Sequence, residues 1–296
     1  MAPGINRLKT WILIAAMGGL FVLVGSWIGG TSGAVIALGI ALIFNFSMYW
    51  FSDRIAIATT RSKPVTEQEM PDYYRVVREL ANEQKLPMPR LHVSDMMQPN
   101  AFATGRSPEH AAVAVTRGIL QILDERELRG VLAHELSHVA NRDILISSIA
   151  AAIGMSITFL ARFAFFFGGD DEGGGNIFAL LLAWVLAPIA AALIQMAVTR
   201  SREFQADESG AFLSRDPDAL ASALLKLEEA SRRVPAPASV SPAEAHLFIV
   251  NPMNALQARG RGGISNLFRT HPPTEVRVER LRAIASELRG ERGPIG

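Results

Sequence analysis

Four long apolar runs constrain the fold of this chain more than any other feature of its sequence. They cover residues 11–28, 34–51, 144–167 and 177–198. Each run is about long enough to cross the roughly 30 Å hydrocarbon core of a bilayer as a helix. A glycine-rich turn separates the first two runs, and a polar loop at residues 168–176 separates the last two. The sequence therefore predicts two transmembrane hairpins, each followed by a soluble segment.

The first apolar run has one alternative interpretation. Arg7 and Lys9 precede it, as basic residues precede the apolar core of a cleaved signal peptide. The second run follows almost at once, however, and Trp27 and Trp50 lie where the membrane–water interfaces are expected. We therefore expect a retained hairpin over residues 1–56.

Basic residues lie on one side of all four runs, and the opposite loops contain neither Lys nor Arg. The flanking residues are Arg7, Lys9, Arg54, Arg61, Lys63, Arg142, Arg200 and Arg202. Because cytoplasmic loops carry an excess of Lys and Arg, both termini and the soluble segments are predicted in the cytoplasm. Arg162 lies inside the third run, where its long side chain can reach the interface; a functional role is the alternative.

Composition excludes several classes of function. The chain has no cysteine, which excludes disulfides, thiolate catalysis and cysteine metal sites. Lys and Arg number 29 against 28 Asp and Glu, so the overall charge gives no reason to expect a nucleic-acid partner. Any metal ion must be bound by histidine and carboxylate side chains.

The soluble segments have mixed helix and strand patterns. A helix is predicted from about residue 66 to 84, short strands at 90–94, 101–104 and 111–116, and later helices at about 216–233 and 274–288. We predict an α+β fold: a mainly α-helical membrane protein with four transmembrane helices and a cytoplasmic domain that contains a small β-sheet. The expected units are residues 1–56, 57–143, 144–199 and 200–296.

The strongest chemical signal is a His-Glu-x-x-His pattern formed by His134, Glu135 and His138. On a helix the two histidines lie one turn apart on one side, where they can bind one zinc ion. Glu135 is placed to take a proton from a water molecule on that metal. Asp124 and Glu127 form a plausible capping box, which supports a helix at this position.

A catalytic zinc usually has three protein ligands, so a third must come from elsewhere in the chain. The remaining histidines are His92, His110, His246 and His271. Glu203 and Asp207 are the carboxylate alternative, because they follow the fourth apolar run, and the hairpin returns the chain to the motif helix. Their i, i+4 spacing lets one bind metal while the other bonds a ligating imidazole. An ion pair for Glu203 and a surface position for Asp207 are the competing interpretations.

Four segments together carry a family resemblance: residues 99–105, 134–138, 202–207 and 270–275. In this order, and with the leading hairpin, the chain resembles the HtpX-type membrane metallopeptidases, relatives of the CAAX prenyl proteases. Four spans, not about seven, favour the HtpX branch. The resemblance implies a zincin-like, inner-membrane zinc endopeptidase that acts in membrane-protein quality control and the stress response.

The resemblance also implies residue roles. One Zn²⁺ per chain would be bound by His134, His138 and Glu203, with Glu135 as the general base. Asp207, His271 and Asn100 are candidates for supporting a ligand, the oxyanion or the substrate. His271 could equally form a helix-entry turn, and Asn100 is expected on an edge strand that receives an extended peptide.

The expected partners are the lipid bilayer and membrane-protein or unfolded polypeptide substrates, and self-cleavage is possible. One alternative is a metal-stabilised membrane chaperone or peptide-binding protein without turnover, against which the intact Glu135 argues. A small transporter is a second alternative. The scarcity of polar residues within the four runs argues against it.

Overall fold

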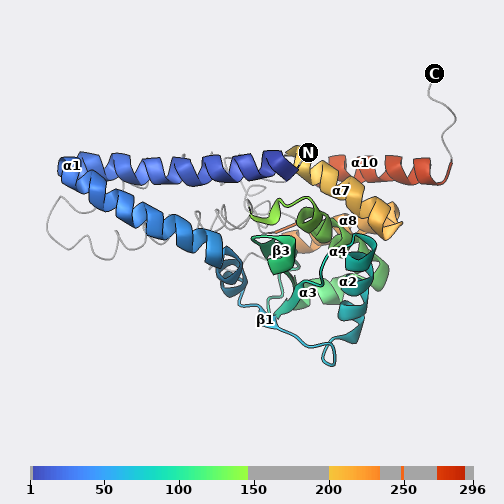
Figure 1. The fold of residues 1–296 in the computed structure, drawn as a ribbon. Helices are drawn as coiled ribbons and strands as arrows, with labels where there is room; N and C mark the ends of the chain where they lie inside the picture. The colour runs from blue at the N-terminus through green and yellow to red at the C-terminus, as the bar shows by residue number, and fades with distance from the viewer. Residues whose placement is uncertain (1–2, 146–199, 234–247, 250–271, 291–296) are drawn as a thin grey trace, which may run out of the picture.

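The computed structural model describes residues 3–145, 200–233, 248–249 and 272–290 of the 296-residue chain. Arg162, His271 and both apolar runs of the predicted second hairpin lie outside the described residues, apart from the first two positions of the run at 144–167. Within them the chain is mostly helical with one small mixed sheet, so the predicted α+β class is confirmed there (Figure 1).

The N-terminal apolar segment forms the long helix α1, Pro3–Thr59, which is broken at Gly29 and Gly30. Gly30 has φ 55°, a backbone conformation that glycine adopts without steric cost. The helix therefore folds back on itself in two arms (Figure 1). Phe21 and Phe44 pack across the arms with ring centroids 5.4 Å apart. The first two apolar runs thus form the two arms of a kinked helix, and their place in a membrane stays a prediction.

One helical segment in the described part of the chain, Gly29–Phe51, is long and apolar enough to cross a membrane. Its side chains face outward: only 12% of its most apolar window is buried, and Ile43 is 71% exposed. The predicted total of four spans stays a prediction.

The sheet has four strands in the order β1-β2-β4-β3. They are β1 (Lys63–Pro64), β2 (Arg90–Ser94), β3 (Ala101–Gly105) and β4 (Ala111–Thr116). β2 and β4 are parallel, whereas β3 pairs with β4 antiparallel and Ala103 lies opposite Val113. β3 is therefore an edge strand. The three predicted strands are confirmed, and β1 adds a two-residue strand that was not predicted.

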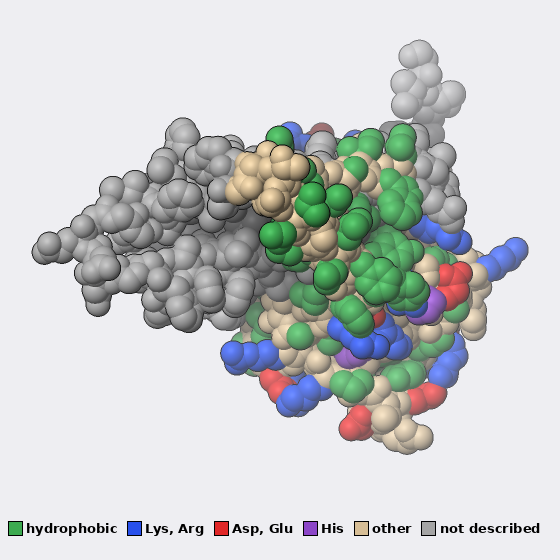
Figure 2. Space-filling view, turned by 60° about the vertical axis from the view of Figure 1, so that its left-hand side comes forward, with side chains coloured by type: hydrophobic (Ala, Val, Ile, Leu, Met, Phe, Trp, Pro, Cys, Tyr) green, Lys and Arg blue, Asp and Glu red, His purple; other side chains and the backbone are tan. Residues whose placement is uncertain are grey.

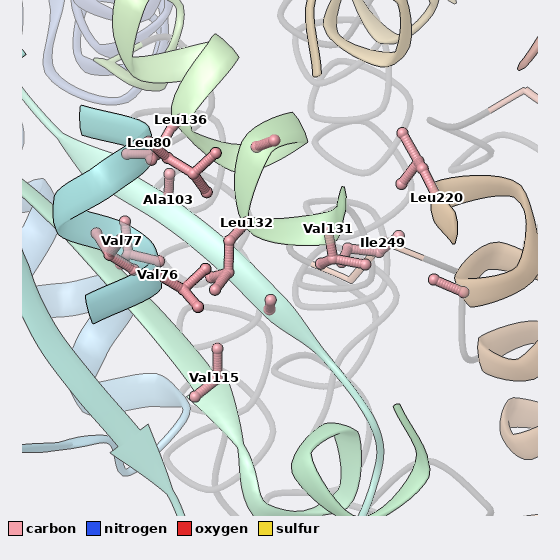
Figure 3. Close-up of a cluster of buried hydrophobic side chains, with 14 of the residues drawn as sticks. Val76, Val77, Leu80, Ala103, Val115, Val131, Leu132, Leu136, Leu220 and Ile249 are labelled. Carbon is pink, nitrogen blue, oxygen red and sulfur yellow. The ribbon is translucent and has the colours of Figure 1, made fainter. Parts of the chain in front are cut away.

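Both faces of the sheet are covered, which explains why every residue of β4 is buried. Helices α2 (Pro71–Glu83) and α4 (Glu125–Ala140) pack on one face, where Val76, Leu80 and Leu132 contribute to the core (Figure 3). On the other face, Ala56 at the end of α1 packs against Phe102 and Ala114. The N-terminal helix is thus fixed directly to the edge strand.

Three later helices complete the core: α7 (Arg200–Ser214) and α8 (Pro217–Arg233) pack on α4, and α10 (Thr274–Leu288) packs on α7 and α8. Shorter helices lie at α3 (Arg117–Ile122) and η1 (Pro108–His110). The predicted helices near 216–233 and 274–288 are confirmed. Most charges of α10 lie on its outer side, but Arg277 is only 2% exposed and pairs with a buried carboxylate.

The motif helix α4 ends before the third apolar run begins. Its last helical residue is Ala140, and Arg142 has φ 56°, so the chain turns there. Ile144, the first residue of the apolar run, is 1% exposed inside the soluble core. A turn therefore separates the motif helix from the third apolar run.

Candidate metal centre

The N-terminus of α4 is anchored by the predicted capping box. The Asp124 side chain accepts a hydrogen bond from the Glu127 backbone, and Glu127 accepts one from the Asp124 backbone. Glu127 also accepts from Lys226 and Ser222 of α8, each at 2.7 Å. Burial raises the pKa of Glu127, but these hydrogen bonds outweigh it and lower the pKa below its ordinary value. The helix that carries the motif is therefore fixed to its neighbour.

His134 and His138 turn the same ring nitrogen toward each other, with their Nε2 atoms 3.2 Å apart. Glu203 of α7 faces both rings: its Oε2 lies 3.8 Å from Nε2 of His134, and its Oε1 lies 3.7 Å from Nε2 of His138. These ligand atoms all lie within 4.8 Å of one another. The structure thus brings together the three residues that the sequence proposed as ligands.

The opposite nitrogen of each imidazole faces a carboxylate. His134 Nδ1 lies 2.9 Å from Asp207, and His138 Nδ1 lies 3.1 Å from Asp143. A carboxylate at Nδ1 favours a proton there and leaves the Nε2 lone pair for a metal. The sequence had proposed this role for one of the pair Glu203 and Asp207. It had not identified Asp143, whose only local signal is its place just beyond the end of the motif helix.

Asp207 is itself held by a buried arginine of α10. Arg277 donates from Nε to one oxygen of Asp207 at 2.8 Å and from Nη2 to the other at 2.7 Å. Burial would raise the pKa of Asp207, but Arg277 and His134 together lower it to about 2. The carboxylate is therefore charged at neutral pH, and α10 is tied to the metal centre.

Glu135 lies on the side of α4 that faces the sheet. Its Oε2 accepts a hydrogen bond from the backbone N–H of Ala103 at 2.8 Å. Burial raises the pKa of Glu135 above its ordinary value, and the positive charges of His134 and His138 oppose this only in part. A carboxyl with a raised pKa suits a group that must accept a proton and later return it.

Arg202 is a buried charged residue. The sequence had identified it only as one of the basic residues that flank the apolar runs. It is 4% exposed, and its Nε and Nη1 atoms have no hydrogen-bond partner within the described ranges. Burial lowers its pKa, while the charges of Asp143 and Glu203 favour the protonated form. The guanidinium therefore adds positive charge next to an acidic cluster.

Asn100 is buried just before β3, in a network of backbone hydrogen bonds. Its backbone N–H donates to Thr116 Oγ1 at 2.9 Å, and its side-chain oxygen accepts from the Ile249 backbone at 3.0 Å. Asn100 thus links the edge strand to the segment that contains Ile249. Its predicted contact with substrate stays a prediction, and His271 lies outside the described residues.

The donor set fits a divalent metal ion. Two imidazole nitrogens and one carboxylate converge, which is the ligand composition of catalytic zinc sites that leave a position open for water. The carboxylates at both Nδ1 atoms match the outer shell that such sites require. A buried His-Glu-x-x-His helix, joined by a glutamate from a second helix, defines the class of the metalloproteases.

Comparison with known proteins gives the family. The chain matches the profile of peptidase family M48 over residues 67–285. Proteins named Protease HtpX homolog from Ralstonia pickettii (strain 12J) and Burkholderia thailandensis are each 52% identical over 283 residues, covering 95% of this chain and 97% of the relative. The chain therefore belongs to peptidase family M48 and is a metalloprotease. These matches confirm the predicted resemblance to the HtpX-type metallopeptidases.

A solved structure was also matched, that of S. mikatae Ste24p. It is 18% identical, with a TM-score of 0.49, and the match covers 93% of this chain and 65% of that one.

Proposed function

We propose that this metalloprotease is a zinc endopeptidase of the inner membrane, which cleaves cytoplasmic segments of misfolded or damaged membrane proteins. The observation that carries the proposal is the convergence of His134, His138 and Glu203 on one point. Glu135 lies on α4, the helix that carries both histidines. Such an enzyme would serve proteolytic quality control.

The residues have separate roles in this proposal. His134, His138 and Glu203 would hold one Zn²⁺, which when bound supplies a Lewis acid that polarises the scissile carbonyl and activates water. Glu135 accepts a proton from the attacking water and donates it to the departing amine. Asp207 keeps the His134 ring in the orientation that points Nε2 inward.

The edge strand β3 offers a position for the substrate backbone. β3 is the edge strand of the sheet, and its Ala103 N–H donates to Glu135, so this strand lies directly beside the proposed general base. An extended polypeptide that pairs with this edge would be held by main-chain hydrogen bonds. Recognition of the main chain supports cleavage of many different unfolded segments. Such segments would include parts of the enzyme's own chain, which gives self-cleavage.

The outward-facing apolar side chains of the segment Gly29–Phe51 support a place in the bilayer. The basic residues that flank the apolar runs support a cytoplasmic site and cytoplasmic termini. A metal-stabilised peptide-binding protein without turnover would need the same ligands. The Glu135 carboxylate, buried beside the histidines, favours hydrolysis instead.

The test uses the full chain purified in detergent, stripped with a chelator and then reloaded with Zn²⁺. A fluorogenic, unfolded casein serves as the probe substrate, and mass spectrometry identifies the cut positions. We expect internal cuts from the zinc-loaded protein, none after stripping, and recovery on reloading. Release of terminal residues alone, or no cleavage in any metal state, would overturn the proposal.

A further inference from the structure

Two arginines from distant parts of the chain each lie over an aromatic ring, on adjacent residues of α1, where its apolar segment ends. Trp50 and Arg54 lie one turn apart on α1, and Arg106 follows directly after strand β3. The guanidinium carbon of Arg106 stands 4.4 Å from the centroid of the Trp50 ring, and that of Arg54 stands 5.4 Å from the Phe51 ring. We call these four residues the arginine–tryptophan cluster.

The positive charges of this cluster are not neutralised within the described part of the chain. Neighbouring arginines have carboxylate partners: Arg90 pairs with Asp53, and Arg117 pairs with Asp95. In the same described ranges, no carboxylate lies within ion-pair distance of Arg54 or Arg106. Both guanidinium groups can therefore pair with an anion that does not belong to the protein.

The surroundings of the cluster are apolar on one side only. Trp50 and Phe51 are 41% and 42% exposed, and the segment Gly29–Phe51 ends at the cluster. Figure 2 shows Lys and Arg side chains gathered directly beside exposed hydrophobic ones. If α1 crosses the bilayer as proposed, the cluster lies at the depth of the headgroups, where tryptophan is enriched.

We propose that Arg54 and Arg106 together bind the phosphate of an anionic phospholipid headgroup, while Trp50 contacts the upper acyl chain. The inference rests on the proposed membrane placement of the protein. Guanidinium groups pair with phosphate oxygens through two parallel hydrogen bonds, and two arginines on one phosphate favour a lipid with net negative charge. A zwitterionic headgroup is less favoured, because its own cationic group would lie close to the two arginines.

Lipid binding at Arg106 would also influence the catalytic site, because strand β3 connects the two. Arg106 follows Gly105, whose φ of 143° and close approach to the His110 carbonyl leave no room for a side chain. Two residues earlier in the same strand, Ala103 donates to Glu135. Fixing Arg106 to a lipid therefore holds the end of the strand that we propose as the substrate platform.

Lipid retention tests the inference without any substrate. The full chain is reconstituted in nanodiscs of equal phosphatidylcholine and phosphatidylglycerol, released in mild detergent, and its retained lipids are counted by native mass spectrometry. We expect selective retention of phosphatidylglycerol by the wild type and at least a fivefold loss in the double variant R54Q/R106Q. The control R232Q, which removes an exposed charge on α8, should retain lipid like the wild type.

Two further arms separate the alternatives. Arg106→Lys keeps the charge but loses the paired hydrogen bonds, so it should retain less lipid than the wild type and more than R54Q/R106Q, which distinguishes lost binding from misfolding. Millimolar inorganic phosphate should not displace the lipid; full displacement would assign the site to free anions and overturn the inference, as would equal retention by wild type and R54Q/R106Q. Because no cleavage is measured, an inactive protein would contradict the proposed function and leave this result readable.

Discussion

At the residue scale, the two histidines of the metal centre are supported in different ways. His134 is backed by Asp207, which is locked by Arg277 from a helix distant in sequence. His138 is backed by Asp143, which lies only five residues further along the chain. Both arrangements present Nε2 to the same point, so the orientation of the ligands is set before any metal binds.

Glu203 is the ligand whose assignment is most easily tested. In Glu203→Gln one of three ligands is weakened, and we expect metal affinity to fall by more than the roughly 10–100-fold typical of losing an outer-shell partner. The measurement is zinc stoichiometry and affinity on the purified protein. Glu208→Gln, an exposed neighbour on α7, is the matched control. Unchanged zinc stoichiometry and affinity in Glu203→Gln would mean that the third ligand is one of the remaining histidines.

The metal-free site should hold protons that zinc must displace. Burial lowers the pKa of His138, but the charges of Asp143, Glu203 and Glu135 outweigh it and raise the pKa to about 10. Because the raised pKa keeps the ring protonated below about pH 10, zinc affinity should rise by about tenfold per pH unit for each displaced proton.

Competition with a chelator at pH 6, 7 and 8 measures this dependence. Asp143→Asn removes the charge that contributes most to the raised pKa and should flatten the curve. A wild-type affinity that does not change over this pH range would contradict the account.

The sequence predicted the local part of the site well and the buried charges poorly. Helical spacing alone predicts the placement of His134, Glu135 and His138. Glu203 was one of several candidates for the third ligand, and only the family resemblance singled it out. Arg277 could not be distinguished from Arg280 and other charges on α10, because the local pattern does not show which face is buried. Asp143 was missed because helical spacing does not predict the turn at Arg142 that brings this carboxylate back to His138.

At the scale of elements, the site depends on how closely α4 and α7 approach. A side chain at Gly210 of α7 would stand 2.8 Å from the backbone nitrogen of His134, and one at Gly130 of α4 would stand 3.1 Å from Leu220 of α8. Glycine at these two contacts lets the helix backbones touch. The distance between Glu203 and the histidines is therefore set by Gly210.

We expect Gly210→Ala to push α7 away from α4 and to draw Glu203 out of reach of the metal. The variant should lose zinc affinity and about 1–3 kcal/mol of stability, the usual cost of overpacking. Thermal unfolding with and without zinc measures both effects. Ser209→Ala, one position earlier on the same helix, should behave like the wild type. Equal zinc affinity in Gly210→Ala and the wild type would refute this role.

The elements themselves were largely predictable. Strands β2, β3 and β4 and helix α10 follow from apolar alternation and turn residues. The short strand β1 and the sheet order were not predicted, because two residues carry no pattern and the parallel pairing of β2 with β4 joins segments about 20 residues apart.

At the scale of the whole molecule, one exposed apolar helix is joined to the catalytic fold through the sheet. Ala56 packs on Phe102, and Asp53 of α1 pairs with Arg90 of β2. The candidate membrane segment and the edge strand are therefore directly connected. The predicted topology of four spans and cytoplasmic termini extends this arrangement to residues outside the described ranges.

Introduced cysteines can test the topology cleanly, because the chain has none of its own. The predicted outer loop at residues 168–176 should let Gly174→Cys react with a membrane-impermeant maleimide in intact cells. Glu83→Cys, exposed at the end of α2, should react only after the cells are opened. Labelling of Glu83→Cys in intact cells would contradict the predicted orientation.

The central claim is that Glu135 performs the proton transfer while other residues hold the metal. The most direct measurement compares Glu135→Gln with the wild type for zinc content and for cleavage of unfolded casein. The account predicts equal zinc and a loss of cleavage of about 10²–10⁴-fold or more, because the amide cannot accept the proton. Cleavage at the wild-type rate by zinc-loaded Glu135→Gln would contradict it.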